Sequence, residues 1–306
     1  MTAEYEVPTW DTGMKEVAAG AYAYFQAEGS WFLSNAGLIV GSDRSIVIDS
    51  LGTIGFNLAF LGEIRKVSEK PVRYLVNTHH HGDHIYGNHL FPGAVAICQT
   101  RCREEIEKGG TPDPERLSQV FPGFDFTGVR ATPPDITFDS RLTLHLDGRE
   151  VHLVYYGPAH TVGDIIAWLP QDGVVFAGDL LFLYSTPLCM QGSFAGWIRA
   201  MDAMIDLDAG VYVPGHGPEC GKEGAIECRD YLVFLRDQAR KRFDAGMSAL
   251  EAARDINPGR FRKWANWERI VANVARLYCE FHGEDALSPL DIAGIFAQMG
   301  ELARSV

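Results

Sequence analysis

The stretch NTHHHGDH at residues 77–84 holds four of the ten histidines of the chain, together with an aspartate. It directly follows the apolar run VRYLV, which is typical of a buried strand. His79 and His81 are two residues apart, so both imidazoles point to the same side of an extended backbone. Asp83 and His84 follow a glycine that permits a tight turn. Imidazole and carboxylate are the non-sulfur ligands that Zn²⁺ prefers. The stretch therefore predicts a metal site at the end of this strand.

A metal explains this clustering better than a structural role does. A single histidine is usually a surface residue or a hydrogen-bonded core residue, and we expect this of His145, His152 and His282. Burying four imidazoles and a carboxylate together without a cation would cost roughly several kcal/mol in unpaired polar groups and repulsion. His89 and Asp164 lie close to candidate ligands in the chain and are candidates for orienting them.

The composition is that of a globular protein and restricts its partners. The 306 residues, 46% hydrophobic and 22% charged, suffice for one large domain or for a domain with a smaller appendage. A formal net charge of −13 disfavours nucleic acid and anionic membranes, so we expect a small-molecule substrate. The chain shows no apolar leader and no apolar run of membrane length, which predicts a cytoplasmic protein. The six cysteines form no CxxC pair and are expected to be reduced.

Short apolar segments alternate with helical patterns over the first two thirds of the chain. The dipeptide Asp147-Gly148 between two apolar runs predicts a hairpin. Strands are expected at residues 21–25, 36–40, 45–48, 72–76, 95–98, 142–146, 151–155, 165–169, 174–177 and 211–213. Helices are expected at residues 56–67, 100–108 and 195–205. This order predicts an α/β fold with mixed sheets covered by helices.

Two further segments differ from this alternation. Residues 109–139 are rich in proline and glycine but also in large apolar side chains, which predicts a long surface loop near a functional site. Helical periodicity dominates after about residue 222, and Ser248 with Glu251 predicts a capping box. We expect a catalytic domain over residues 1–222 and a C-terminal helical region over residues 223–306, which serves as a lid or as a homodimer contact.

The spacing of His79, His81, Asp83 and His84 resembles the HxHxDH motif of the metallo-β-lactamase superfamily. Three further pieces follow in the order of that family, each at the end of an apolar strand: GPAHT ending at residue 161, FAGD ending at residue 179 and PGHG ending at residue 217. The resemblance covers about Gly20 to Gly221. It implies the αββα sandwich of that superfamily, followed here by a C-terminal helical extension.

The resemblance also implies a binuclear metal centre. By residue type, Zn²⁺ is the preferred ion, and iron and manganese remain open. The family pattern assigns His79, His81 and His160 to a first ion, Asp83, His84 and His216 to a second, and Asp179 to both. The spacing alone predicts only the cluster at residues 77–84, whereas the roles of His160, Asp179 and His216 rest on the resemblance. Asp49 matches an acidic position that orients ligand imidazoles in the family.

Such a centre implies a hydrolase in which metal-bound hydroxide attacks an ester, lactone or thioester, with Asp83 orienting the nucleophile. Asp179 is similar to the bridging aspartate of glyoxalase II and lactonases. Phe182 stands where true β-lactamases carry a cation for the substrate carboxylate, and no basic glutathione-binding set is evident. Aromatic residues in segments 29–32, 120–126 and 182–197 favour an apolar or aromatic acyl substrate.

Three alternatives remain at this stage. The first is a β-lactamase-type amide hydrolase. The second is a mononuclear iron oxygenase of the persulfide dioxygenase type, which metal analysis would distinguish. The third is a non-catalytic protein with a structural metal site, which the completeness of the seven-residue set disfavours.

Overall fold

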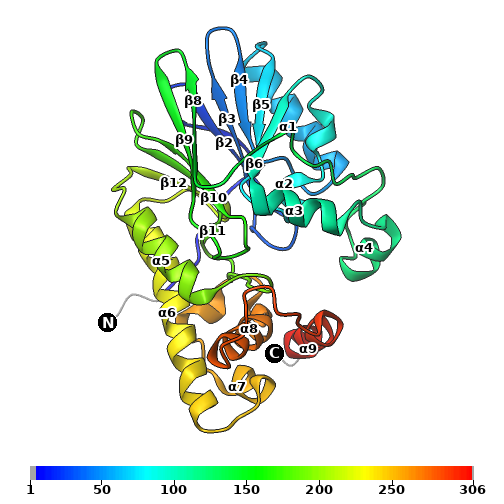
Figure 1. The fold of residues 1–306 in the computed structure, drawn as a ribbon, viewed down its shortest axis with the longest axis vertical. Coiled ribbons are helices and arrows are strands. Elements are labelled where there is room, and N and C mark those ends of the chain that lie inside the picture. The colour runs from blue at the N-terminus through cyan, green and yellow to red at the C-terminus, as the bar shows by residue number, and fades with distance from the viewer. Residues whose placement is uncertain (1–4, 305–306) are drawn as a thin grey trace.

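The computed structural model describes residues 5–304, which form two mixed β-sheets packed face to face with helices on the outside (Figure 1). The first sheet has the strand order β1-β2-β3-β4-β5-β6-β7 and the second the order β12-β11-β10-β9-β8. The expected αββα sandwich is thereby confirmed.

In the first sheet, the strands from β1 to β4 pair antiparallel and those from β4 to β7 pair parallel. Its strands are β1 (Gly13–Ala18), β2 (Ala21–Phe25), β3 (Ala36–Val40), β4 (Ser45–Ile48), β5 (Val72–Val76), β6 (Val95–Gln99) and β7 (Ile136–Phe138). The helices between these strands are α1 (Ile54–Val67), the short α2 (Gly82–Ile85), α3 (Thr100–Gly109) and α4 (Pro114–Val120).

The second sheet is antiparallel except for the pair β11–β12, which is parallel. Its strands are β8 (Arg141–Leu146), β9 (Arg149–Tyr155), β10 (Ile165–Leu169), β11 (Val174–Phe182) and β12 (Val211–His216). The predicted hairpin joins β8 and β9, and both of its central residues have positive φ, 54° at Asp147 and 80° at Gly148.

Side-chain alternation along β3 and β4 divides the core into two layers. Ile39, Ile46 and Ile48 face the second sheet and pack with Val151, Leu153 and Phe176. Leu38 and Val47 face the other way and pack under Phe60 and Ile64 of α1. All of these side chains are buried, so the sandwich is held mainly by the removal of apolar surface from water.

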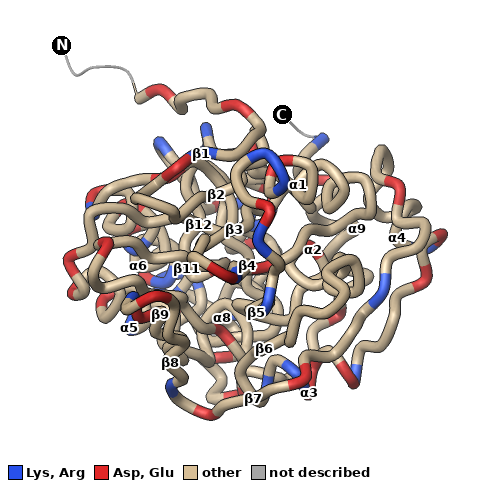
Figure 2. The backbone as a smooth tube through the Cα atoms, turned by 90° about the horizontal axis from the view of Figure 1, so that it is seen from above, with Lys and Arg blue, Asp and Glu red and all other residues tan. Residues whose placement is uncertain are grey.

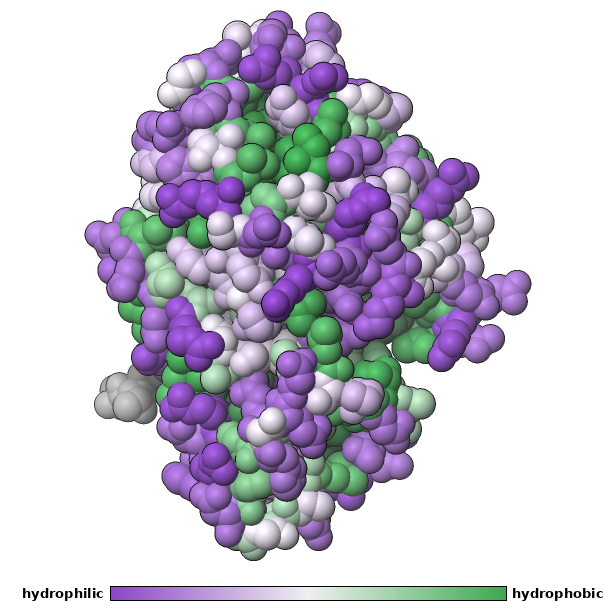
Figure 3. Space-filling model, in the orientation of Figure 1, coloured by the Kyte–Doolittle hydropathy of each residue, from purple (hydrophilic) through white to green (hydrophobic). Residues whose placement is uncertain are grey.

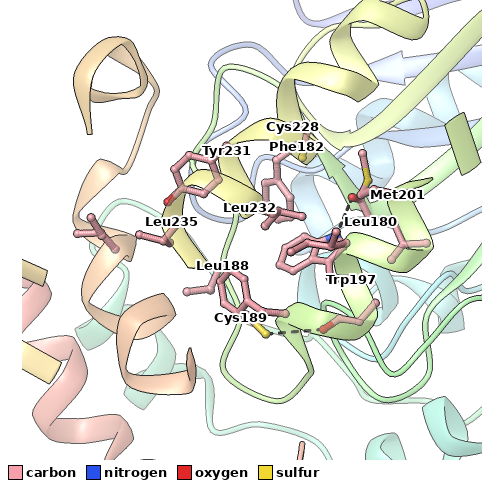
Figure 4. Packing of buried hydrophobic residues seen from close by; sticks show 14 of the residues in the cluster. Leu180, Phe182, Leu188, Cys189, Trp197, Met201, Cys228, Tyr231, Leu232 and Leu235 are labelled. Atoms are coloured by element: carbon pink, nitrogen blue, oxygen red, sulfur yellow. Dashed lines mark hydrogen bonds between the residues drawn. The ribbon is translucent and has the colours of Figure 1, made fainter. Parts of the chain in front are cut away.

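Five helices complete the fold: the first two pack on β11 and β12 of the second sheet, and the other three lie beyond the sheets and pack against these two or against one another (Figure 1). They are α5 (Phe194–Ile205), α6 (Lys222–Asp244), α7 (Ala249–Asp255), α8 (Ile270–Phe281) and α9 (Ile292–Arg304). Figure 4 shows Trp197 of α5 and Tyr231 of α6 packed around residues of β11, and the Trp197 Nε1–H donates to the Leu180 carbonyl oxygen at 2.8 Å. One continuous hydrophobic cluster runs from β11 through α5 and α6 into α8 and α9.

The structure confirms most of the expected elements and corrects some. Nine of the ten expected strands end within three residues of their expected ends, and the capping box of Ser248 and Glu251 is formed. The strand expected at residues 174–177 continues to Phe182, so Asp179 lies within β11 and not at the end of a strand. Residues 109–139 are not a plain loop, because they contain α4 and β7. The Asp113 carboxylate accepts from the Glu115 N–H at 3.0 Å, and Pro114 occupies the first helical turn, so α4 is locally encoded. Strand β1 was also not expected.

Charged residues of both signs are interspersed along the backbone (Figure 2). None of the helices in residues 5–304 combines the length and the apolar character that crossing a membrane requires.

Candidate metal centre and pocket

Seven buried or half-buried side chains meet where the two sheets adjoin. They come from four places in the chain: the end of β5 with α2, the loop after β9, the middle of β11 and the end of β12. These are the seven predicted ligands His79, His81, Asp83, His84, His160, Asp179 and His216.

His79, His81, His160 and Asp179 form a first group, in which the potential ligand atoms all lie within 4.8 Å of one another. The Nε2 atom of His160 lies 2.9 Å from Nδ1 of His81 and 3.4 Å from Oδ2 of Asp179. The Nε2 atom of His79 lies 3.8 Å from the same carboxylate oxygen. Four potential ligand atoms thus surround one point.

Asp83, His84 and His216 form a second group within the same distance limit. The Nε2 atom of His216 lies 3.2 Å from Oδ2 of Asp83. Asp179 also approaches this group, with Oδ1 at 3.1 Å from His84 Nε2 and Oδ2 at 3.4 Å from His216 Nε2. The Asp179 carboxylate therefore lies between the two groups, where the family pattern places a shared ligand.

Several of these buried atoms lack hydrogen-bond partners in the described chain. They are Nε2 of His79, Nε2 of His84 and Oδ1 of Asp179. Although His84 Nε2 and Asp179 Oδ1 are only 3.1 Å apart, their geometry is not that of a hydrogen bond. Buried polar atoms without partners cost about 1–3 kcal/mol each. The donor set of imidazole nitrogen and carboxylate oxygen, with its ligand atoms unpaired and convergent, fits divalent metal ions.

Hydrogen bonds at the opposite ring nitrogens hold the imidazoles in place. The Asp49 carboxylate lies 3.0 Å from His84 Nδ1 and accepts from both the N–H and the hydroxyl of Thr78 at 2.7 Å. The Thr78 hydroxyl lies 3.1 Å from His79 Nδ1, so one carboxylate organises two ligands. This is the orienting role expected for Asp49.

The imidazoles of His160 and His216, the two candidate ligands from the later part of the chain, are held by backbone carbonyl oxygens. The Nδ1–H of His160 donates to the Leu188 carbonyl oxygen at 2.6 Å, and that of His216 to the Gly29 carbonyl oxygen at 3.1 Å. A proton on Nδ1 leaves the lone pair of Nε2 free for a metal. His81 is the exception, because its Nδ1 is the atom that faces the group.

Gly178 allows Asp179 to reach this position. Its φ is +50°, and it lies at an irregularity in the pairing of β11 with β12. A Cβ atom at this position would lie 2.5 Å from the Thr78 hydroxyl. Only glycine allows the strand to approach Thr78 and the Asp49 network so closely.

Electrostatics differ between the two groups. Burial lowers the pKa values of His79, His81 and His160, the last to about 4. Burial acts in the same direction on His84 and His216, but the nearby carboxylates, Asp179 first, outweigh it and raise both pKa values. The first group is therefore neutral and ready to bind metal over a wide pH range, whereas protons compete at the second.

Asp164 and His89, the two other candidates, act differently. The Asp164 carboxylate accepts from the N–H of Thr161 at 2.8 Å and from its hydroxyl at 2.5 Å, so it orders the loop that carries His160. Burial raises the pKa of Asp164 to about 7. No hydrogen bond or ion pair joins His89 to the seven candidate ligands in the described chain, and the structure gives it no orienting contact.

A cavity of about 210 Å³ opens onto Asp83, Asp179 and His216. Its walls are mostly apolar, and the Phe182 ring stacks on the His216 imidazole with ring centroids 4.9 Å apart. The three aromatic segments expected near the substrate all contribute. The remaining wall residues include Trp31, Phe32, Phe121, Leu188, Met190, Arg269 and Phe296.

Sequence analysis missed Arg269 and Phe296. Both come from the C-terminal helical region, far along the chain from every candidate ligand, and a lone arginine before an apolar helix carries no recognisable pattern. The sequence analysis considered a cation for the pocket only at position 182 and in a glutathione-binding set, and so did not consider Arg269. Phe182 stands at the position where true β-lactamases carry a cation, but the guanidinium of Arg269 lines the same cavity from the segment before α8.

Two facing mixed sheets with a His/Asp cluster at their junction define a fold of the metallo-hydrolase type. A model of the metallo-β-lactamase superfamily matches residues 29–216, more than half of the chain, and the chain belongs to this superfamily.

Curated relatives and solved structures agree with this assignment. Linear primary-alkylsulfatase from Pseudomonas sp. (strain ATCC 19151) is 23% identical over 262 residues, covering 72% of this chain and 49% of the relative. Hydroxyacylglutathione hydrolase from Methylococcus capsulatus is 26% identical over 136 residues, covering 44% of each chain. The chain spans about half the length of these relatives or less.

Among solved structures, a stereoselective inverting sec-alkylsulfatase from Pseudomonas sp. matches 91% of this chain and 52% of its own, with a TM-score of 0.67 and 17% identity. A metallo-beta-lactamase family protein from Thermus thermophilus matches 88% of this chain and 95% of its own, with a TM-score of 0.64 and 19% identity. At these identities the structural likeness shows the fold.

Proposed function

We propose that the protein is a dinuclear metal-dependent hydrolase that cleaves an ester, lactone or thioester of a small apolar or aromatic acyl substrate. The position of Asp179 supports this most strongly, because its two carboxylate oxygens lie 3.1–3.8 Å from Nε2 atoms of both histidine groups. A mononuclear oxygenase would bind metal only at the first group. The second group, in which His84 Nε2 is buried without a hydrogen-bond partner, would then have no ligand.

His79, His81 and His160 would hold one ion, Asp83, His84 and His216 the other, and Asp179 both. Zinc suits this donor set best, and iron and manganese are the alternatives to test. When bound, the ions supply a water molecule of lowered pKa and polarise the carbonyl group of the substrate.

The protein itself contributes orientation. The Asp83 side chain faces the cavity, and 14% of it remains exposed. Burial opposes its ionisation, but His84 and His216 outweigh that effect and lower its pKa to about 2, so the carboxylate stays an acceptor at neutral pH. In this position Asp83 accepts a hydrogen bond from the attacking water and fixes its direction towards the substrate.

No side chain in the pocket competes as the nucleophile. Cys189 is close to the loop of His160, and its Sγ–H lies 3.7–3.8 Å from two backbone carbonyl oxygens. Burial raises its pKa well above the usual value, so it stays a thiol. Trp31, Phe121 and Phe296 line the cavity with apolar surface, which suits the hydrophobic part of a substrate and displaces water.

Sulfate-ester hydrolysis is a second candidate. It is favoured by the alkylsulfatase relative, which matches 72% of this chain, and by the alkylsulfatase structure, whose match covers 91% of this chain and so reaches into the C-terminal helices.

The test is metal quantification on the purified protein, combined with an assay panel of ester, lactone, thioester, β-lactam and alkyl sulfate. We expect two divalent ions per chain and turnover of an ester-type substrate that a chelator abolishes. Full activity after removal of the metal would contradict the proposal. One iron per chain with oxygen uptake would favour the oxygenase alternative.

A further inference from the structure

Arg269 is a buried cation in the wall of the candidate active site. It lies just before α8, only 2% of it is exposed, and it lines the same cavity as Asp83 and Asp179. Burial lowers its pKa to about 10, so the guanidinium is still charged at neutral pH.

Most of the hydrogen-bonding capacity of this guanidinium is unused. Nη1 donates to the Thr186 carbonyl oxygen at 2.9 Å and to the Ser185 hydroxyl at 3.3 Å. Nε is buried without a partner, and Nη2 makes no hydrogen bond with any residue that the structure describes. No carboxylate oxygen in residues 5–304 lies within 4.0 Å of Arg269.

A second buried arginine shows what a purely structural role looks like. Arg276, two turns further along α8, is 1% exposed. Its Nε and Nη2 donate to the Met190 carbonyl oxygen, and its other contacts are to the Asp285 and Ser288 carbonyl oxygens. All three side-chain nitrogens of Arg276 donate to backbone carbonyl oxygens, whereas Nε of Arg269 has no hydrogen-bond partner.

The free donors of Arg269 are held in a fixed place. Its guanidinium lies over the Trp31 ring, 4.1 Å from the centroid. The neighbouring Glu268 accepts from Trp31 Nε1 at 3.3 Å and so is directed at the indole rather than at the guanidinium. The Ala265 backbone bonds to Tyr184 and Thr186 at 2.9 Å and 2.8 Å, which ties the segment before Arg269 to the chain that leaves β11.

The nearest opposite charges in the cavity are Asp83 and Asp179, and both are candidate metal ligands. Once they are committed to divalent ions, Glu268 is the remaining acidic neighbour, but its carboxylate is directed at the Trp31 indole, and no carboxylate oxygen in residues 5–304 forms an ion pair with the guanidinium. A buried unpaired charge is expensive, and the cost is recovered when an anion pairs with it.

An apolar path leads away from this charge. A further cavity of about 310 Å³ shares Trp31, Phe121 and Phe296 with the first and continues between α4 and α9. Val120, which lines this second cavity, is 45% exposed, and Figure 3 shows apolar side chains at the surface of the molecule.

We infer that Arg269 binds an anionic group of the substrate, a carboxylate or a sulfate, while Phe121 and Phe296 hold its apolar part. The inference rests on the proposed function and narrows its substrate class to anionic amphiphiles. The β-lactams of the assay panel carry a carboxylate and so belong to this class.

The experiment compares two matched esters, 4-nitrophenyl hemiglutarate with its free carboxylate and 4-nitrophenyl valerate without one, in the metal-loaded full chain. The variants are R269Q, R269K and the control R262Q, because Arg262 stacks on Trp267 at 3.5 Å and does not line the cavity. A hydrogen-bonded ion pair is worth about 1.5–3 kcal/mol, or roughly 10–100-fold in affinity.

We expect R269Q to lower kcat/KM for the carboxylate ester about 10–100-fold, mainly through KM, and to change the valerate ester less than about threefold. R269K should recover part of the loss, and R262Q should behave like the wild type. Equal losses on both esters, or no loss on either, would overturn the assignment.

Binding is measured separately, so that failure of the proposed function does not obscure the result. Hexanoate, hexyl sulfate and hexanol are titrated into the same metal-loaded proteins by calorimetry. Wild type should bind at least one of the two anions about tenfold more tightly than hexanol, and R269Q should lose that preference. The two anions distinguish a carboxylate from a sulfate site. If R269Q does not fold, R269K and the wild-type preference decide, and no preference for either anion refutes the inference.

Discussion

The β-sandwich and the C-terminal helices contribute different residues to the same pocket: the sandwich supplies the candidate metal ligands, and the helical region supplies part of the wall. All seven candidate ligands lie between His79 and His216, within the range that the superfamily model matches. The helices from α6 onward add no ligand to this set, yet their part of the chain supplies Arg269 and Phe296 to the cavity wall. The candidate ligands and two residues of the cavity wall thus come from different parts of the chain.

The substitution D179A should have the largest effect, and it tests whether the candidate ligands of the β-sandwich hold the metal. Because the Asp179 carboxylate approaches both histidine groups, its loss should remove most of the bound metal and lower kcat by about a thousandfold or more. Metal content by mass spectrometry and steady-state kinetics measure the two effects. D237A, at an exposed aspartate of α6, is the matched control and should change neither.

D49N tests the support behind the ligands. Asp49 accepts from Thr78 and holds His84, so its loss should weaken metal binding about 10–100-fold while all seven ligands remain. Competition with a chromogenic chelator measures the affinity, and D43N at an exposed position is the control. Unchanged affinity would show that the His84 ring is held by packing alone.

A change of pH should separate the two metal positions. The pKa values of His84 and His216 are raised above the usual imidazole value of 6.5, so protons compete with metal there already above that pH and increasingly as the pH falls, at a cost of up to about tenfold in affinity per pH unit and per imidazole. The lowered pKa values of His79, His81 and His160 protect the first group over the same range. Equilibrium dialysis should show the stoichiometry falling from two towards one, and simultaneous loss of both ions would contradict the asymmetry.

The substitution F296A should have the smallest effect on catalysis, and it tests the contribution of the C-terminal helices to substrate binding. Removing this ring opens the apolar wall, so KM for an apolar substrate should rise about three- to tenfold with kcat and metal content unchanged. I292A, at an exposed position of the same helix, is the control. A loss of kcat equal to that of D179A would mean that the helices take part in the chemistry.

The metal site was far more predictable than the pocket. The spacing of His79, His81, Asp83 and His84 places four candidate ligands within six residues, so local geometry alone indicates a metal. His160, Asp179 and His216 needed the family resemblance, because a single polar residue within or after a strand carries no signal of its own. The two mixed sheets followed from the alternation of apolar segments.

Arg269 could not be predicted because its partners are distant in sequence. Its carbonyl partner at Thr186 lies 83 residues away, and its stacking partner Trp31 is further still. Helix α4 was hidden by the proline and glycine content around it, although Asp113 and Pro114 are a recognisable helix start. Strand β1 is only half-buried at the sheet edge and has no strong apolar alternation.

The backbone hydrogen bonds of Ala265 have a mechanical consequence. They clamp residues 184–186, which leave β11 only a few positions after Asp179, to the segment that ends in Arg269. The segment before α8 is therefore joined by backbone hydrogen bonds to the chain that leaves β11, the strand of Asp179. A displacement of this segment would have to break those bonds or move that part of the chain with it.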